Sequence, residues 1–161
     1  MSTSRVPALI DYLVTTFTAA STLGAATPAV RVFDGPVITS DPAGLALSVG
    51  VDDAFPEGVT TSAESEQAAV GLAQKREELV TVHCAAVAWG GDDLKTVRLA
   101  ATGIAAAVED LVRADTTLAG QTGAALARPG VTGMVLQQNI PAEGAIAQVS
   151  FRIEYKTLIG A

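Results

Sequence analysis

The sequence predicts an α+β protein in which two helices cover one face of a mostly antiparallel β-sheet. Three observations lead to this prediction: two amphipathic helical patterns, several short alternating segments, and one long strand that runs directly into the longer helix. The expected order is α-β-β-β-α-β-β, with no internal repeat and no linker that would divide the chain. We therefore expect a single two-layer domain over residues 1–161.

The first helix is predicted near the start of the chain, where apolar residues recur at intervals of three and four. Thr3 or Ser4 can cap it, and Pro7 is tolerated in a first helical turn. Short strands are expected around residues 30–33 and 45–51, each bounded by turn signals. The apolar stripe of the helix consists of Val6, Leu9, Ile10, Leu13, Val14 and Phe17.

The centre of the predicted fold is a strand from about Leu79 to Trp89, which a Gly-Gly turn connects to the longest helix. One face of this strand is wholly apolar and the other is mixed, which is typical of a central strand. Asp92 or Asp93 can cap the helix and complement its dipole. The helical stripe is rich in alanine, which predicts close packing on the sheet; it consists of Leu94, Val97, Ala101, Ile104, Ala105, Val108, Leu111 and Val112.

The C-terminal part predicts two further strands that a turn at residues 141–144 connects. The first covers residues 131–138, and the second alternates so clearly that a half-buried antiparallel strand is expected. By contrast, residues from about 52 to 75 show no convincing periodicity. This excursion is expected to be either a long loop or a β-hairpin extension. In the last strand, Val149, Phe151, Ile153, Tyr155 and Thr157 share one face, and Gln148, Ser150, Arg152, Glu154 and Lys156 share the other.

Composition and charge narrow the class of function. Apolar residues make up 49% of the chain and charged residues only 17%, so apolar surface remains after a core is built, which indicates subunit contacts. The 10 basic and 17 acidic residues give a net charge of −7 without any Lys/Arg cluster, which argues against direct DNA binding. Residues 12–30 are too polar for a membrane-spanning helix, and a signal peptide is poorly supported. A soluble, cytoplasmic protein is therefore expected.

No residue pattern predicts a catalytic, cofactor or metal site. His83 and Cys84 are neighbours on a strand, so their side chains point to opposite faces and cannot act as a base and its nucleophile. The aspartate pairs at residues 52–53 and 92–93 lack the spacing of a calcium loop. The Gly-Gly pair before the helix resembles half of a phosphate cradle, but the two aspartates after it would repel an anion. We expect no enzyme activity and no cofactor.

Several residues are candidates for subunit contacts. Trp89 ends the central strand, where it either packs against the start of the helix or lies in an interface. The alternating charges of the last strand form either a solvated sheet face or contacts between subunits. The candidate interface residues are Asp52, Asp53, Phe55, Glu57, Trp89, Arg152, Glu154 and Lys156.

Five segments of the chain together suggest a known family: VFDGPVITSDP and LSVGVDD around the first strands, VHCAAVAWGGDD and AAVEDLVRAD around the long helix, and the closing AQVSFRIEYKTLI. With these segments the chain resembles the tail terminator proteins of long-tailed (siphovirus-type) actinobacterial phages. The resemblance covers Leu9 to Ile159 and lies in turns and strand ends rather than in catalytic residues. It departs from the family before the central strand, where Leu72, Ala73 and Gln74 replace an aromatic-containing segment.

The resemblance implies a structural virion protein that forms a ring, expected to be a homo-hexamer. Such a ring ends tail-tube polymerisation and joins the tail to the head-completion proteins. Its partners would be further copies of the chain, the major tail-tube protein and a head-completion or neck protein, with no membrane contact.

DNA would pass through the lumen of this ring without specific binding, which the acidic charge suits. The ring would lie at the head-proximal end of the tail after assembly in the host cytoplasm. The alternatives are another head–tail connector or tail-completion protein, or a small ligand-binding domain or enzyme.

Overall fold

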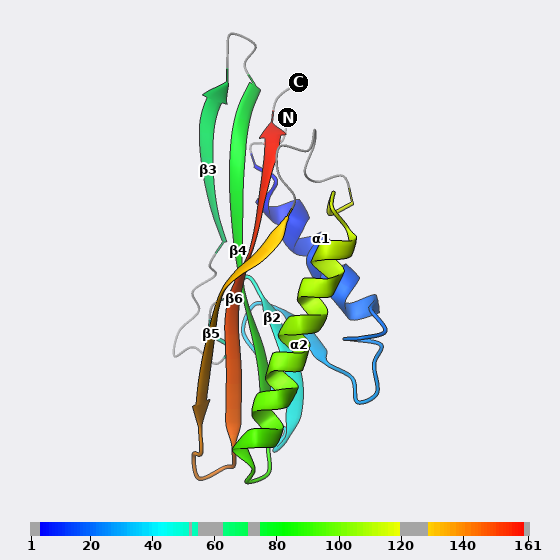
Figure 1. The fold of residues 1–161 in the computed structure, drawn as a ribbon, viewed down its shortest axis with the longest axis vertical. Coiled ribbons are helices and arrows are strands. Elements are labelled where there is room, and N and C mark those ends of the chain that lie inside the picture. The colour runs from blue at the N-terminus through cyan, green and yellow to red at the C-terminus, as the bar shows by residue number, and fades with distance from the viewer. Residues whose placement is uncertain (1–3, 52, 55–62, 71–74, 120–128, 160–161) are drawn as a thin grey trace.

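The computed structural model describes residues 4–51, 53–54, 63–70, 75–119 and 129–159. Two helices pack on one face of a single long, twisted sheet, which Figure 1 shows nearly edge-on with the helices to its right. This confirms the predicted α+β class with a mostly antiparallel sheet. The elements are α1 (Val6–Ala19), β1 (Arg31–Asp34), β2 (Gly44–Val49), β3 (Ala63–Val70), β4 (Lys75–Trp89), α2 (Leu94–Ala114), β5 (Gly130–Asn139) and β6 (Ile146–Ile159).

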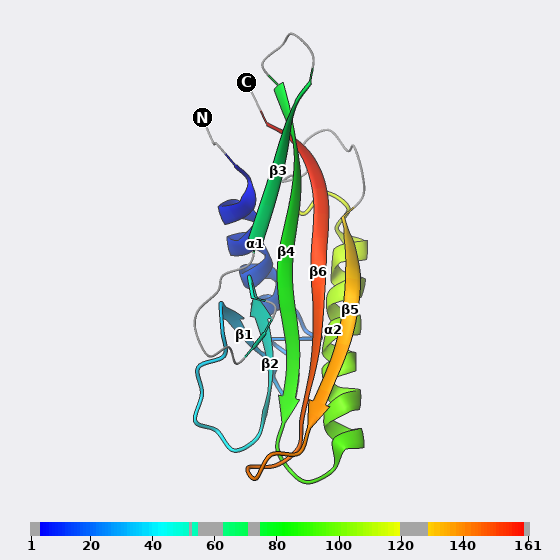
Figure 2. The same ribbon diagram turned by 90° about the vertical axis from the view of Figure 1, so that its left-hand side faces the viewer.

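The sheet is built around the long antiparallel pair of β4 and β6, and its order is β1-β2-β4-β6-β5. On the edge of β4 away from β6, β3 pairs with residues 75–82 and β2 pairs with residues 84–89. Among the described strands, β1 and β2 are the only parallel pair. As Figure 2 shows, β3 and β5 therefore lie on opposite sides of the β4–β6 pair.

Strand β3 settles the alternative left open for part of the 52–75 excursion. Residues Ala63–Val70 run antiparallel to the first half of β4, as a hairpin extension requires. The predicted order therefore gains one strand, and β4 begins at Lys75, four residues earlier than the alternation had indicated. Most of the remaining excursion lies outside the described residues.

The main core lies between the helices and the sheet. The alternate residues of β4 that face the helices are buried, as are six of the eight predicted positions along α2, so the alternation of β4 and the helical stripe of α2 are confirmed. Leu94 and Leu111 of the predicted α2 stripe are only partly buried and pack against the core. The buried residues from these two elements are Val80, Val82, Cys84, Ala86, Ala88, Val97, Ala101, Ile104, Ala105, Val108 and Val112.

The turn between β4 and α2 requires glycine. Gly90 has a φ of 115°, and a Cβ atom there would lie 2.3 Å from the Cβ of Ala43. Only a residue without a side chain permits both this backbone conformation and this approach. Asp93 then occupies the N-cap of α2, where its Oδ1 accepts a hydrogen bond from the backbone N–H of Lys95 at 3.0 Å. The turn and cap predictions are thus confirmed.

The start of α1 is held by a residue that the sequence patterns did not indicate. Glu78, which is fully buried on the helix-facing side of β4, accepts hydrogen bonds from the Ser4 hydroxyl at 2.6 Å and the Arg5 backbone N–H at 3.0 Å. A carboxylate at this position also complements the positive end of the helix dipole. Arg5 is the N-cap residue, and Ser4, expected to be the cap, accepts from the backbone N–H of Val6.

A smaller apolar cluster covers one end of the opposite face of the sheet. Segments before β2 and after it fold back there, joined by a hydrogen bond from the Val37 N–H to the Ala54 carbonyl at 2.8 Å. At this end the face is therefore covered by the chain itself, and only the rest of its length is left for solvent or another subunit. The cluster contains Val37, Ala46, Ala54, Ala85 and Val87, with Phe33 and Trp89 packed against it.

Candidate subunit interface

The face of the sheet without helices brings the predicted charged residues of β6 together. Arg152, Glu154 and Lys156 stand in a row along β6, and their register partners on β4 are His83, Thr81 and Leu79, respectively. We call these six residues the open face. Their side chains are half-buried or exposed, and Leu79 is the one exposed large apolar residue among the six. The open face thus combines apolar and charged groups, as surfaces between subunits do.

The charged residues of the open face form ion pairs, either with each other or with a neighbouring residue of β4. Arg152 Nε lies 3.8 Å from Glu154 Oε1, and Lys156 forms an ion pair with Glu77 of β4. Exposed pairs of this kind contribute only about 0–1 kcal/mol to stability. The row of charges is therefore a weak stabiliser of the fold, and its main physical effect is on what can dock against it.

A depression of about 400 Å³ lies between the open face and β5. A β-bulge between Thr132 and Val135 forms one wall, and within it Gly133 has a φ of 64°. A Cβ atom on Gly133 would lie 2.9 Å from Arg152 Nη2, so glycine lets the guanidinium lie against the backbone of β5. The bulge therefore connects the open face to the edge of the sheet.

Strand β5 forms that edge, and most of it is exposed. It pairs only with β6 among the described strands, and residues 132–139 are all exposed. Met134, Val135 and Leu136 are consecutive exposed apolar residues, with Val135 54% exposed. The chain carries no charged residue from Gly130 to Ala142. Soluble proteins usually protect a sheet edge with charges, short strands or proline, because its unpaired backbone groups attract other strands.

Trp89 lies at the far end of the same face. Its indole Nε1 donates a hydrogen bond to the Asp41 carbonyl at 2.9 Å, and the Arg31 guanidinium lies 5.6 Å from the ring centroid. Arg31 also forms a 2.6 Å ion pair with Asp41. Trp89 thus packs against the segment before β2 rather than against the start of α2.

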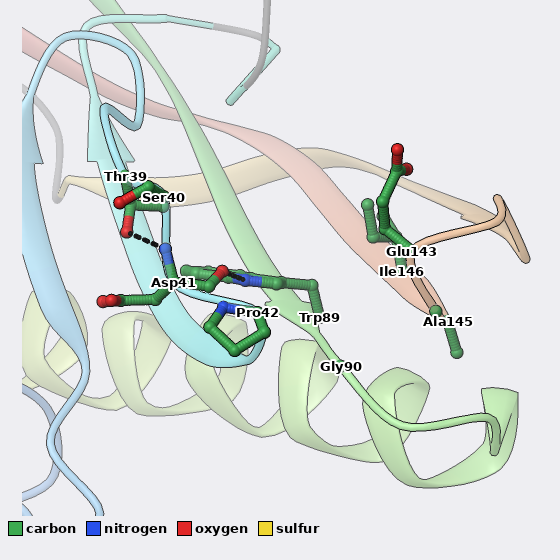
Figure 3. A pocket seen from close by; sticks show the side chains of 10 residues that line it. Thr39, Ser40, Asp41, Pro42, Trp89, Gly90, Glu143, Ala145 and Ile146 are labelled. Atoms are coloured by element: carbon green, nitrogen blue, oxygen red, sulfur yellow. Dashed lines mark hydrogen bonds between the residues drawn. The ribbon is translucent and has the colours of Figure 1, made fainter.

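A cavity of about 340 Å³ adjoins this tryptophan. Figure 3 shows the indole beside Asp41 and Pro42, with Glu143 and Ile146 across the cavity from them. Part of the ring remains accessible, so an interface role for Trp89 stays a prediction.

The other predicted interface residues lie in or near the 52–75 excursion. Asp53 is exposed and lines a smaller cavity of about 180 Å³ with Gln137, Asn139 and Gln148, close to β5. Asp52, Phe55 and Glu57 lie outside the described residues. The structure therefore places five of the eight candidates, all on the side of the sheet without helices, but spread along its length.

The chain matches none of the protein-family models and none of the curated proteins with which it was compared. Its geometry and the resemblance of its sequence segments are then the grounds for assigning a function.

The residues that first suggest chemistry have structural roles where they are described. Burial raises the pKa of the Cys84 thiol to about 12, although a hydrogen bond with the Gly50 backbone lowers it, so a reactive thiolate is disfavoured. His83 lies on the opposite face of β4. Hydrogen bonds from the Thr96 side chain and the Lys95 backbone lower the pKa of Asp93, the cap of α2. The described residues contain no group of three or more His, Cys, Asp or Glu arranged to hold a metal ion.

Membrane insertion through a helix also finds no support in the described part of the chain. Neither α1 nor α2 combines the length and the apolarity that a membrane-spanning helix requires.

Two features of the candidate interface were not predicted from the sequence patterns. Gln148 was expected on a polar face, yet it is buried, and its Oε1 accepts a hydrogen bond from the Ala54 N–H at 3.0 Å. The edge position of β5 was not predicted either, because alternation along a strand does not specify its neighbours. The missing charge between Gly130 and Ala142 is the one signal in the sequence that could have drawn attention to it.

Proposed function

We propose that the chain is a ring-forming structural protein of a phage tail, of the tail-terminator type. Its ring ends tail-tube polymerisation and joins the tail to the head-completion proteins. The observation that carries the proposal is the exposed, uncharged edge strand β5 beside the open face. An edge of this kind needs a covering partner, and the sequence resemblance supplies the kind of assembly that provides one.

The shape of the sheet supports a ring in particular. Its two sides end in different strands, β5 on one side and β1 with β3 on the other. A contact between two different surfaces repeats from copy to copy, and it closes into a ring when the rotation permits. The number of six subunits follows from the resemblance alone.

The acidic balance of the chain supports the role of a DNA conduit. With a net charge of −7, a ring of these chains would carry a large negative charge. Such a lumen would not hold passing phosphates, since like charges repel. In this proposal the ring lies at the head-proximal end of the tail, between the tail-tube protein and a head-completion or neck protein.

The proposal is tested with purified chain and tail-tube protein. Electron microscopy is expected to show ring-shaped particles, and adding them to polymerising tube protein should give short tubes with rings at one end. Rings that ignore tube ends but bind head-completion proteins would point to another connector component instead. A chain that stays monomeric at high micromolar concentration would contradict every ring function.

One observation favours a second candidate function, a small ligand-binding domain. The cavity beside Trp89 is large enough for a small molecule and combines an aromatic wall with the Glu143 carboxylate. Trp89 is the only tryptophan of the chain, so its fluorescence reports directly on this cavity. A fragment screen that shifts Trp89 emission in a strictly monomeric protein would favour this candidate over the ring.

A further inference from the structure

We propose that the outer edge of β5 pairs with the outer edge of β3 in a second copy of the chain, so that the sheet continues from one protomer to the next. This inference deepens the proposed function and depends on it for the closed ring. The pairing itself is argued from the two sheet edges.

The β5 edge is suited to pairing with a strand from another copy of the chain. Val135 lies on the open side, opposite Ser150, and Leu136 lies on the helix side, opposite Val149. Apolar groups therefore flank the edge on both faces, where an added strand would cover them. The absence of charge from Gly130 to Ala142 means that a chain with a net charge of −7 meets no local repulsion there.

On the other side of the sheet, β3 offers the longer edge. It has eight residues and pairs only with β4 among the described strands, whereas β1 has four residues. Short edge strands are a common protection against pairing, so β1 is the poorer partner. The ten residues of β5 and the eight of β3 also match closely in length.

Strand direction favours the same pairing. Each of the contacts β3–β4, β4–β6 and β6–β5 is antiparallel, so β3 and β5 run in opposite directions within one protomer. If neighbouring copies point the same way, as in a ring, β5 of one copy meets β3 of the next in the antiparallel sense. The alternating strand directions then continue from one copy into the next. The contact is antiparallel, which is the more stable kind of strand pairing.

The two edges are staggered along the strands. Strand β5 lies level with residues 146–154 of β6, whereas β3 pairs with the half of β4 that faces residues 153–159. Successive copies can therefore form a closed ring only if their strands tilt relative to the ring axis, as in closed barrels. Without that tilt the same contact generates an open filament.

The test uses the full-length chain with substitutions on each edge. Val135→Lys puts a charge on the β5 edge, and Leu99→Lys is the matched control, because Leu99 is 62% exposed on the outer side of α2. Gln67→Pro disrupts the β3 edge, because proline has no backbone N–H. The substitution removes either a donor on the outer edge of β3 or a backbone hydrogen bond to β4. Sedimentation velocity between about 1 and 200 µM, a range spanning weak to moderate affinities, measures assembly.

We expect the wild-type chain and Leu99→Lys to assemble equally, and Val135→Lys and Gln67→Pro to raise the dissociation constant at least tenfold while keeping a folded circular dichroism spectrum. An equimolar mixture of the two edge variants should form dimers, because each supplies the edge that the other lacks. A mixture that stays monomeric would overturn the pairing of β5 with β3. Assembly of Gln67→Pro on its own would indicate a symmetric contact of β5 with itself and would also overturn that pairing. Unchanged assembly of Val135→Lys would overturn the role of β5.

These results also separate the inference from the proposed function. If Val135→Lys still forms rings that cap tubes, the β5–β3 contact is wrong and the terminator function stands. If the wild-type chain assembles through these edges but never caps a tube, the contact stands and the terminator function is wrong.

Discussion

The two faces of the β4–β6 pair differ sharply, although alternate residues of the same two strands build both. On the helix-facing side, Val82, Cys84 and Phe151 are fully buried or nearly so. On the open face, Leu79 is 39% exposed and the Arg152 side chain 45%. The strands make successive side chains point to alternate faces, and the helices bury one of these faces from solvent. Stability is therefore concentrated on one face, and the other remains available for contacts.

Helix α2 shows the same contrast. Its inner side presents Ala101 and Ala105 to the sheet, both at most 1% exposed, whereas Leu99 and Ala106 face outward. Small residues let the helix approach the strands closely, since little side-chain bulk lies between the two layers. Substitutions on the covered side should therefore affect stability more than substitutions on the uncovered side.

The largest effect is expected in the core. Phe151→Ala should destabilise the protein by about 3–5 kcal/mol, because it removes a large buried ring and leaves a cavity. Val135→Ala on the exposed edge should change the free energy of unfolding of the monomer by no more than about 0.5 kcal/mol. Urea denaturation at low protein concentration measures both. Similar losses for the two variants would show that the faces do not differ as described.

A smaller loss is expected from overpacking the helix–sheet contact. Ala105→Leu should destabilise by about 1–3 kcal/mol, since three additional heavy atoms cannot fit between α2 and the sheet without strain. Ala106→Leu, the neighbouring substitution on the outer side, should leave the stability nearly unchanged. Thermal unfolding followed by circular dichroism compares the two variants. Equal stability would show that Ala105 does not lie on the side of α2 that packs against the sheet.

The cap of α2 gives a pH dependence. The pKa of Asp93 is lowered in the folded chain by its hydrogen bonds, so its charge stabilises the fold above the usual aspartate pKa, and this contribution is lost as the pH falls through the lowered value. Asp93→Asn keeps an acceptor but removes the charge. The melting temperature of the wild type should exceed that of Asp93→Asn at pH 7 by a small margin that disappears near pH 2. A margin independent of pH would exclude this charge effect.

The smallest effect is expected on the open face. Lys156→Ala breaks an exposed ion pair with Glu77 and should cost only about 0–1 kcal/mol. High salt should reduce the difference further, because it screens exposed charges. Denaturation at low and high ionic strength measures this. A loss as large as that of Ala105→Leu would mean that the open face stabilises the protomer itself.

The sequence predicts the elements that follow a strict period better than those that depend on distant neighbours. The buried stripe of α2 and the helix-facing residues of β4 follow from apolar spacing alone, and Asp93 follows from local cap chemistry. The same alternation places Arg152, Glu154 and Lys156 on one face.

The features that the sequence does not predict are set by residues far apart in the chain. Strand β3 lacks a continuous alternation of apolar residues and is held by its backbone pairing with β4. The contact between Ser4 and Glu78 joins residues 74 positions apart, and the buried Gln148 depends on Ala54. The exposure of β5 depends on the order of strands in the sheet, which no local pattern encodes.

Hydrogen exchange at rising protein concentration tests the central claim, that β5 joins copies of this chain, most directly. Mass spectrometry would follow the backbone amides of β5, β3 and α2 at dilute concentration and again when sedimentation shows assembly. We expect exchange in β5 and β3 to slow as copies pair, while exchange around the outer side of α2 stays constant. Assembly with unchanged exchange throughout β5 would contradict the account.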